Sequence, residues 1–338
     1  MNRKSVICLG IAVSVLILFF TNLFYGSVSI PAQAVIDILS GKDIEKSVWA
    51  NIILRSRLPQ AITALFAGSA LAVCGLMLQT LFRNPLAGPS ILGISDGANL
   101  GVALVMLYSG GILAFGGERS HQFSVVISAF LGASSVLLLM LYFSSKVKSN
   151  ILVLILGIMI SYLASSGISI LNSYASADNM RMYVLWGMGS FSGVPAEQLP
   201  FFSSAILTGL LFSVLLIKPL NALLLGENYA TNLGIRIGQT RVAILLTTGF
   251  LTALVTAFCG PVTFIGLVVP HIARMFIRTS NQKWLLPATI LTGGFVALVC
   301  NLLISVPFGK GVLPLNAITP LIGAPMVIYV ILKNRKSF

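Results

Sequence analysis

The sequence predicts an all-α polytopic membrane protein in a single domain, residues 1–338, with about ten transmembrane helices and short helices at the cytoplasmic surface. The chain is 57% hydrophobic and only 9% charged, whereas soluble domains carry about 25% charged residues. Its mean hydropathy is +0.99. Apolar runs recur along the whole chain, separated by short polar or Gly/Pro-rich segments. Composition and pattern together therefore predict a bundle of membrane-spanning helices.

The expected spans follow from these runs, because about 20 apolar residues in a helix cross the hydrocarbon core of a bilayer. In chain order they are residues 6–24, 58–82, 91–108, 123–143, 151–171, 199–217, 242–258, 262–270, 284–306 and 315–332. The first run is longer than the apolar region of a signal peptide, so we expect it to be retained. The eighth is short for a full crossing.

Proline, glycine and other small residues mark where these spans begin, pack and end. Pro59 stands where the first turn of a helix tolerates proline. The small residues between positions 67 and 75 would let neighbouring helices approach closely. A Pro/Gly-rich turn, residues 83–90, separates the second span from the third, and Cys259-Gly-Pro261 ends the seventh.

Lys and Arg are distributed unevenly if ten spans place both termini inside. The inner side would hold Arg3, Lys4, Arg83, Lys146, Lys148, Lys218, Arg236, Arg241, Arg274, Arg278, Lys283, Lys333, Arg335 and Lys336. The outer side would hold Lys42, Lys46, Arg55, Arg57, Arg119, Arg181 and Lys310. Twice as many lie inside, as the positive-inside rule requires. Both termini are therefore predicted to be cytoplasmic.

The segment 218–241 is the longest polar interruption in the second half of the chain. It cannot lie in lipid, because charged and amide side chains such as Glu227 and Arg241 would be costly there. Pro219, Gly226, Gly234 and Gly238 divide it into pieces of one or two helical turns. We expect a short helix-turn-helix at the cytoplasmic surface that a soluble partner could grip. The alternative is an ordinary solvated loop.

Several kinds of chemistry find no support in the sequence. His121 and His271 stand alone, and the four cysteines lie within apolar runs without CxxC spacing, so no metal site is predicted. The chain has no GxxxxGK[ST] or GxGxxG motif, so any nucleotide that drives it must bind another subunit. Its basic residues are scattered between apolar runs, which favours a role in membrane topology and not nucleic-acid binding.

Four segments carry a resemblance to a known family. They are Arg57-Leu-Pro59, Asn84-Pro-Leu-Ala-Gly-Pro-Ser-Ile-Leu-Gly-Ile-Ser-Asp-Gly-Ala98, Leu225-Gly-Glu-Asn-Tyr-Ala-Thr-Asn-Leu-Gly234 and Gly260-Pro-Val-Thr-Phe-Ile-Gly-Leu-Val-Val-Pro-His271. In this order they resemble the FecCD family, the type II ABC-importer permeases for iron–siderophore complexes, haem and cobalamin. The resemblance covers about residues 29–332.

The resemblance implies an assembly in the bacterial inner (cytoplasmic) membrane. A second permease subunit would complete a homodimer, with the substrate path along its axis. Two cytoplasmic ATPase subunits would bind ATP and Mg, and a periplasmic or lipid-anchored substrate-binding protein would deliver the cargo. This chain itself would bind no cofactor. The residues similar to the family's coupling helices, which sit in a cleft of the ATPase, are Gly226, Glu227, Asn228, Tyr229, Ala230, Leu233 and Gly234.

The resemblance also implies where the binding protein docks. The family's Arg-Leu-Pro-Arg pattern supplies positive charges for glutamates on that protein. Here Arg57 fits the first position, Gln60 replaces the second Arg, Arg55 lies nearby, and Lys310 is a further candidate on the same side. The alternative for Arg55 and Arg57 is that both simply extend to the membrane interface.

Motif glycines and prolines are expected to form structural turns or breaks. The predicted set is Asn84, Pro85, Gly93, Gly97, Gly260, Pro261, Gly266 and Pro270. Gly93 and Gly97 would allow irregular backbone beside another helix. Asp96, between them, would cap the third span through the helix dipole, or act as a relay in a proton-coupled carrier.

Residues 179–193 match the family's Trp-x-x-Gly-Ser-x-x-Gly segment near the periplasmic mouth of the pathway. The residues that could line the pathway there are Met180, Met182, Tyr183, Trp186 and Met188. They would form a soft apolar wall for a large chelate. They could equally face lipid or the protein core.

The sequence and the resemblance together predict the permease subunit of an ATP-driven importer. Its cargo would be an iron chelate, a ferric siderophore first, with haem or cobalamin as alternatives, moved by alternating access. The chain would perform no chemistry on the cargo and so is not an enzyme. An ion-gradient-driven secondary transporter would need ionisable groups within the spans, where Asp96 is the main candidate. A non-transporting membrane scaffold is a third reading.

Overall fold

A computed structural model describes residues 3–42, 47–108, 118–147, 149–305 and 313–334. Within these residues the fold is helical and contains no strand. The helices are α1 (Arg3–Phe24), α2 (Ala32–Leu39), α3 (Ser47–Ile52), η1 (Ile53–Arg57), α4 (Leu58–Leu81), η2 (Pro89–Leu92), α5 (Ile94–Ala103), η3 (Leu104–Tyr108), α6 (Glu118–Lys146), α7 (Asn150–Tyr174), α8 (Ala177–Gly187), η4 (Phe191–Gly193), α9 (Leu199–Leu215), α10 (Ile217–Leu224), α11 (Glu227–Asn232), α12 (Ile237–Cys259), α13 (Ile265–Ile277), α14 (Gln282–Ser305) and α15 (Leu315–Asn334).

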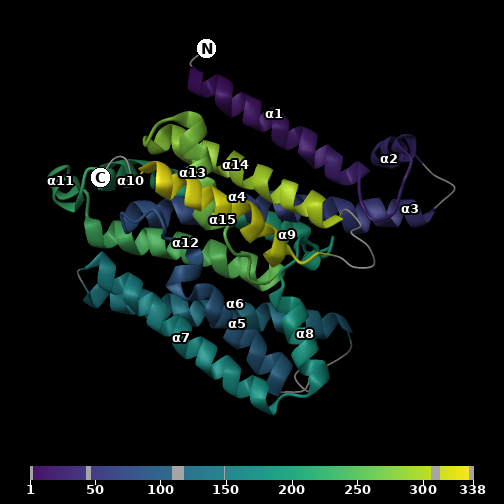
Figure 1. Ribbon diagram of the computed structural model, residues 1–338, viewed down its shortest axis with the longest axis horizontal. Coiled ribbons are helices and arrows are strands. Elements are labelled where there is room, and N and C mark those ends of the chain that lie inside the picture. The colour runs from purple at the N-terminus through teal and green to yellow at the C-terminus, as the bar shows by residue number, and fades with distance from the viewer. Residues whose placement is uncertain (1–2, 43–46, 109–117, 148, 306–312, 335–338) are drawn as a thin grey trace.

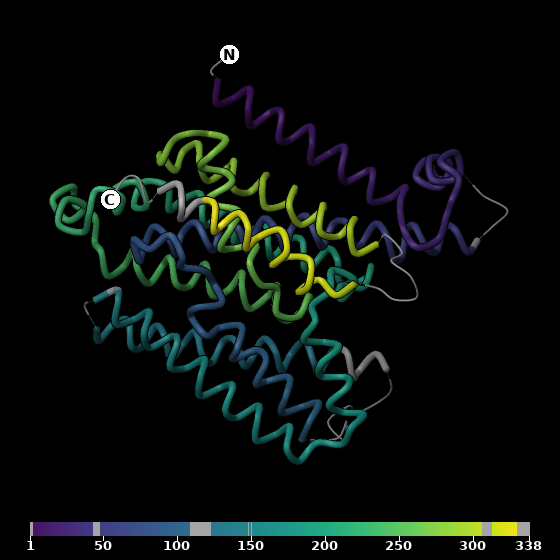
Figure 2. Tube along the Cα trace, in the orientation of Figure 1, coloured from purple at the N-terminus to yellow at the C-terminus, as the bar shows by residue number. Residues whose placement is uncertain are grey.

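The all-α polytopic fold class is confirmed. Of the described helices, 6 are long and apolar enough to cross a membrane, or 7 if α9 and α10 are counted as one bent span. Three shorter apolar helices, Ile94–Tyr108, Ile265–Ile277 and Leu315–Tyr329, occupy the remaining predicted crossings. The helices run broadly along one direction, so their connections gather at the two ends of the bundle (Figures 1 and 2).

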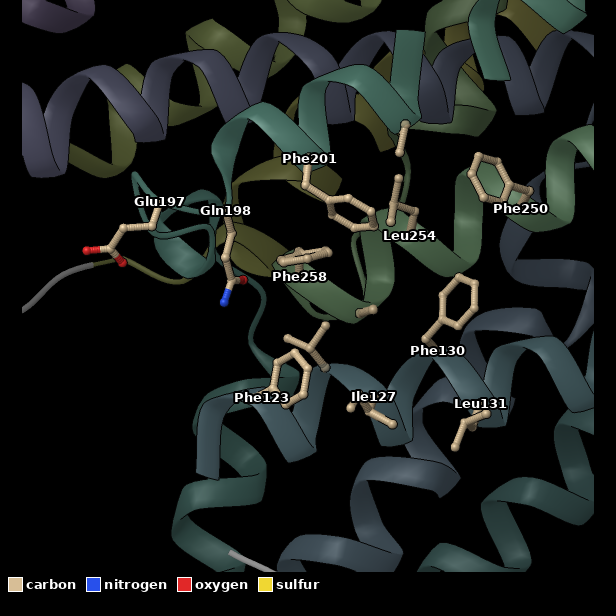
Figure 3. Close-up of a pocket in the computed structure, with 13 residues that line it drawn as sticks. Phe123, Ile127, Phe130, Leu131, Glu197, Gln198, Phe201, Phe250, Leu254 and Phe258 are labelled. Atoms are coloured by element: carbon tan, nitrogen blue, oxygen red, sulfur yellow. The ribbon is translucent and has the colours of Figure 1, made fainter. Parts of the chain in front are cut away.

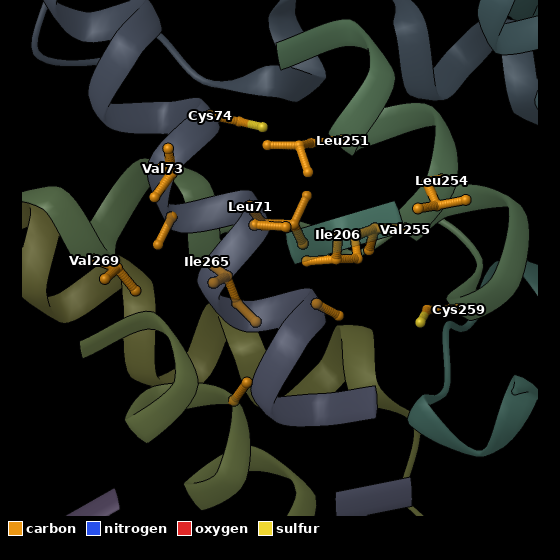
Figure 4. Close-up of a cluster of buried hydrophobic side chains, with 14 of the residues drawn as sticks. Leu71, Val73, Cys74, Ile206, Leu251, Leu254, Val255, Cys259, Ile265 and Val269 are labelled. Atoms are coloured by element: carbon orange, nitrogen blue, oxygen red, sulfur yellow. The ribbon is translucent and has the colours of Figure 1, made fainter. Parts of the chain in front are cut away.

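Helix α4 is the centre of the bundle. It contacts α9, α12, α13 and α14, while α5, α6 and α7 pack together in a separate layer that reaches the rest mainly through α12. Buried side chains from α4, α9, α12 and α13 meet in one cluster, which Figure 4 shows around Leu71, Ile206, Leu251 and Ile265. This cluster fixes the positions of the helices that carry the functional segments.

Small residues let α4 touch its neighbours through the backbone, as the sequence predicted. A Cβ at Gly68 would overlap the carbonyl of Gly293 in α14, and a Cβ at Gly75 would overlap the carbonyl of Gly266 in α13. Pro270 has no N–H, so the Gly266 carbonyl lacks its usual donor within α13 and lies instead against Gly75. Close helix contact of this kind drives association in a membrane.

Two expectations about the secondary structure were wrong. The second span, expected to begin at residue 58, is part of a helix that runs without a break from Val48 to Leu81. Gly266 and Pro270, expected at a break or reversal, lie inside α13, which ends only at Ile277. Packing of α13 against α4 holds this helix together despite its proline.

Candidate coupling surface and open cavity

The coupling segment, residues 218–241, follows a 50° bend between α9 and α10. Asn221 fixes α10 to the start of α14. Its Oδ1 accepts from the Gln282 backbone N–H at 2.8 Å, and its Nδ2 donates to Asn281 Oδ1 at 3.3 Å. The Gln282 side chain donates to Thr80 Oγ1, in the last turn of α4, at 3.2 Å. The segment is therefore attached to two core helices.

Two glycines set the turns on either side of α11. Gly226 has φ +109° and ψ 155°, a conformation that glycine adopts far more readily than other residues. After α11, Gly234 has φ +82°, and its N–H donates to Thr231 O at 2.9 Å. The Ile235 N–H donates to Ala230 O at 3.0 Å. These two bonds form a Schellman motif, which ends a helix at a defined residue. The predicted helix-turn-helix is therefore present: α10 and α11 are joined by the turn at Gly226.

The α11 helix presents most of its side chains outward. Tyr229 and Leu233 are 52% and 58% exposed, and Asn228 is exposed too, whereas Ala230 is buried beneath them. An aromatic and an aliphatic side chain exposed together on a rigid turn are typical of protein interfaces. Apart from the buried Ala230, the residues predicted to couple therefore lie together on one small surface.

Glu227 and Arg241 connect α11 to α12. The Arg241 Nη2 and Glu227 Oε1 atoms lie 3.8 Å apart, and the Arg241 Nη1 donates to the Val147 carbonyl at 2.9 Å. Arg241 was expected in the solvated segment, but α12 begins at Ile237, so Arg241 lies inside that helix and is buried. Its guanidinium thus joins α11 to the connection between α6 and α7.

The turn after α4 lies at the same end of the bundle. Asn84 Oδ1 accepts from the Leu86 N–H at 2.9 Å, and the Pro85 carbonyl lies 2.8 Å from His271 Nε2. Arg83 lies beside the α10–α11 turn, because its Nη1 is 3.8 Å from where a Cβ on Gly226 would be. Asn84 and Pro85 are thus in a structured turn, as predicted.

The motif glycines at the start of α5 behave differently from each other. Gly93, with φ +74°, forms the left-handed turn between η2 and α5. Gly97 was expected in irregular backbone, but it lies within α5, where a Cβ would come 2.6 Å from the Gly132 carbonyl of α6. Its role is close helix packing. Asp96 lies in the first turn of α5 and hydrogen bonds with the Ser161 and Asn99 side chains.

The opposite end of the bundle holds an open cavity of about 480 Å³. The residues that line it are Asn99, Tyr183, Val184, Gly187, Met188, Pro261, Pro314, Asn316 and Ala317. They come from α5, α8, the α12–α13 connection and the start of α15. The part of α12 from Val242 to Cys259 separates this cavity from the coupling segment, a distance of about 27 Å at 1.5 Å per residue.

Asn316 holds three segments together beside the cavity. Its Nδ2 donates to the Pro261 carbonyl at 2.6 Å and to the Gly187 carbonyl at 3.1 Å. Its Oδ1 accepts from the Thr263 N–H and hydroxyl, each at 3.2 Å, and its own N–H donates to the Met188 carbonyl at 3.1 Å. Gly260, with φ +71°, ends α12 and turns the chain into this network together with Pro261.

The predicted pathway residues divide into two groups. Tyr183 and Met188 line the cavity, and the Trp186 ring stacks on Tyr183 with centroids 6.4 Å apart. Burial and the nearby Asp96 carboxylate raise the pKa of Tyr183 to about 12. Met180 and Met182, 39% and 42% exposed, are not among the lining residues.

Asn99 and Asn316 were missed as lining residues. Each is a lone amide in an otherwise apolar run, and amides inside membrane helices usually have a specific partner or face a cavity. That signal is present in the sequence. What the sequence lacks is the pairing of Asn316 with backbone groups more than fifty residues away.

The residues predicted to dock a binding protein are not equivalent. Arg55 is exposed and Gln60 is partly buried, while Lys310 lies outside the described residues. Arg57 was expected to present a positive charge, but it is only 7% exposed. Its guanidinium donates to the Leu23 and Phe24 carbonyls at 2.9 and 3.0 Å and also to the Val28 carbonyl. Arg57 thus stabilises the end of α1.

Within the part of the chain that the structure describes, no three His, Cys, Asp or Glu side chains gather closely enough to hold a metal ion. An exposed helix-turn-helix lies at one end of a membrane-spanning bundle and an open cavity with an uncharged described lining at the other, an arrangement that fits a transport permease.

The chain belongs to the FecCD transport family, whose sequence model matches residues 14–333. It is similar to the hemin transport system permease protein HmuU of Yersinia pestis, with 33% identity over 299 residues, 88% of this chain and 87% of that protein. It is also similar to the vitamin B12 import system permease protein BtuC of Klebsiella pneumoniae, with 32% identity over 283 residues, 84% of this chain and 83% of that one.

A solved structure has the same fold over nearly the whole length. It is an inward-facing conformation of a transporter assigned to the metal-chelate ABC type. The TM-score is 0.84 at 28% sequence identity, and the match covers 97% of this chain and 99% of the other. The chain is thus a membrane permease of the ABC-transporter class, a transport component and not an enzyme.

Proposed function

We propose that this chain is the permease of an ATP-driven importer that carries an iron chelate, a ferric siderophore first, across the bacterial inner membrane by alternating access. One observation carries the proposal. The coupling surface and the open cavity lie at opposite ends of α12, and each is held by defined hydrogen bonds. A push received at one end can therefore alter the cavity at the other through packed helices.

The partners follow from the two surfaces. Two ATPase subunits, which bind ATP and Mg, grip α11 through Tyr229 and Leu233. A periplasmic or lipid-anchored binding protein approaches the cavity end near the exposed Arg55. A second copy of the permease completes the pathway as a homodimer. Both termini are cytoplasmic, because the coupling end carries the Lys- and Arg-rich connections.

The cavity suits a bulky, weakly held cargo. Its described lining is uncharged, with amides at Asn99 and Asn316, the Met188 thioether and the Tyr183 phenol. That phenol is neutral at physiological pH, as tyrosine ordinarily is, and its pKa is raised further to about 12. Its volume of about 480 Å³ falls within the usual range for ligand sites of about 300–1,000 Å³. Such a wall contacts a chelate through uncharged groups and does not replace the ligands of its metal. The chelate is therefore bound weakly and leaves the cavity quickly.

The test is uptake into vesicles that contain the permease with its ATPase and, outside, its binding protein. Labelled ferric siderophore, haem and cobalamin are offered separately. We expect one of them, the ferric siderophore first, to enter only with ATP on the ATPase side and to stop with vanadate. Uptake driven by a proton or sodium gradient without the ATPase would contradict the proposal. Accumulation of haem or cobalamin alone would change the cargo but leave the mechanism in place.

A further inference from the structure

An apolar groove of about 500 Å³ lies between α6, α9 and α12, separate from both the coupling surface and the open cavity. Aromatic rings dominate its wall (Figure 3). Its main side chains are Phe123, Ile127, Phe130, Phe201, Phe250 and Phe258. The Phe258 ring is itself fixed by an edge contact with Phe202, with centroids 5.4 Å apart.

The length of the groove matches one leaflet of a bilayer. Its α6 wall extends from Phe123 to Leu131 and its α12 wall from Phe250 to Phe258. Each wall covers eight helical steps, about 12 Å at 1.5 Å per residue. Half of a hydrocarbon core is about 15 Å thick. The groove therefore has the length of the part of an acyl chain that lies in one leaflet.

One end of the groove coincides with the end of three spans. Glu197 and Gln198 come just before the start of α9 at Leu199, α12 ends at Cys259, and the membrane-spanning part of α6 begins at Phe123. Figure 3 shows the Glu197 and Gln198 side chains together at this edge, with Glu197 pointing outward from the rings. This edge is therefore at the depth of the lipid headgroups.

The charge at this edge selects the headgroup. Glu197 is exposed, and within the described residues no ion pair joins its carboxylate. A carboxylate accepts hydrogen bonds from a cation, and the adjacent Gln198 amide offers a further acceptor and donor. A primary ammonium group fits both, whereas a headgroup without a cation would leave the carboxylate facing a phosphate of the same sign.

We propose that this groove is a lipid-binding site that takes one acyl chain of a phospholipid with a primary ammonium headgroup. The chain lies among the phenylalanine rings, and the ammonium lies against Glu197 and Gln198. An ordered lipid here would pack α6 against α9 and α12, so it would join the α5–α6–α7 layer to the core of the bundle.

The experiment is native mass spectrometry of the full-length chain, purified in detergent and delipidated, with phosphatidylethanolamine and phosphatidylglycerol of the same acyl chains added back. The Ala205→Trp variant fills the groove from α9, and Leu211→Trp places the same side chain on the exposed face of that helix. Glu197→Gln removes the charge, and Asp178→Asn, in the first turn of α8, is the matched control. Melting temperature and oligomeric mass are measured for every variant.

We expect wild-type protein, Leu211→Trp and Asp178→Asn each to retain one phosphatidylethanolamine in preference to phosphatidylglycerol. Ala205→Trp should lose this lipid while its melting temperature without added lipid equals that of delipidated wild type. Glu197→Gln should lower the preference about fivefold, the value of one exposed ion pair. Equal lipid retention by Ala205→Trp and Leu211→Trp would overturn the site. Equal retention of the two lipids by wild type would overturn the headgroup assignment. A change in oligomeric mass confined to Ala205→Trp would instead make the groove an interface between copies.

Discussion

The two ends of α12 hold their functional side chains in different ways. At its start, Gly226 and Gly234 fix the turns around α11, and Asn221 attaches the coupling segment to α14. The segment can therefore move as a whole but has little freedom to change its internal conformation. At its other end, Asn316 joins three separate segments around an open space. The comparison suggests that one end transmits force and the other changes shape.

Charge reversal at Glu227 is expected to have the largest effect. Glu227→Lys would place a second cation opposite Arg241, 3.8 Å away in the present arrangement. We expect ATP-driven uptake to fall about a hundredfold, because the reversed charge repels Arg241 and also replaces a carboxylate on the surface proposed to meet the ATPase, with normal amounts of protein in the membrane. Asp178→Lys at the opposite end serves as the control. Unimpaired uptake in Glu227→Lys would rule out a coupling role for this carboxylate.

Loss of Arg57 should affect folding and not docking. Arg57→Ala leaves the Leu23, Phe24 and Val28 carbonyls without their charged donor. We expect it to destabilise the protein by about 2–3 kcal/mol, seen as a lower melting temperature in detergent. The folded fraction should bind the substrate-binding protein with normal affinity. A large loss of affinity for the substrate-binding protein at unchanged stability would show instead that Arg57 takes part in docking.

Removal of the Asn316 amide tests the cavity end directly. Asn316→Ala should cost about 1–2 kcal/mol, because the Pro261 and Gly187 carbonyls lose their donor. If this end changes shape during transport, uptake should fall by more than the loss of folded protein explains. The measurement is uptake per folded molecule, with Asn228→Ala at the other end as the comparison. If Asn316→Ala and Asn228→Ala showed identical uptake per folded molecule, the proposed distinction between the two ends would be wrong.

The smallest predicted effect is on encounter with the binding protein. Arg55 is exposed, so Arg55→Glu should weaken binding only about fivefold, mainly through a slower association rate at low salt. Surface plasmon resonance at two ionic strengths would measure this effect. The matched change Arg236→Glu, exposed at the coupling end, should leave binding of the substrate-binding protein unaffected.

The sequence predicted the helical spans well but not their environment. The runs that form α4 and α7 are similarly apolar, yet 83% of the most apolar stretch of the helix that contains α4 is buried inside the protein, compared with only 17% of that of α7. In α4, Gly68 and Gly75 allow backbone contact, and this pattern of small residues was the one local clue to which helix is central. Hydropathy alone measures suitability for lipid and cannot separate these cases.

The polar residues show where prediction from sequence ended. Helix-turn-helix geometry around α11 follows from local glycines, so it could be read directly from positions 226 and 234. Burial of Arg57 depends on carbonyls 29 to 34 residues away in the chain, and the network of Asn316 depends on backbone groups 53 to 129 residues away. Such pairings arise only when distant helices have packed, and a motif does not reveal them.

The unbroken helix from Val48 to Leu81 has a mechanical consequence. Its 34 residues make a rod about 50 Å long, well beyond the roughly 30 Å of hydrocarbon. Arg57, in the first third of this helix, holds it against α1, while at the far end Gln79 accepts from Arg274 at 2.7 Å and Thr80 accepts from Gln282. Tilting this helix by a few degrees would move its two ends in opposite directions at the two membrane surfaces at once, because the helix has no break between them.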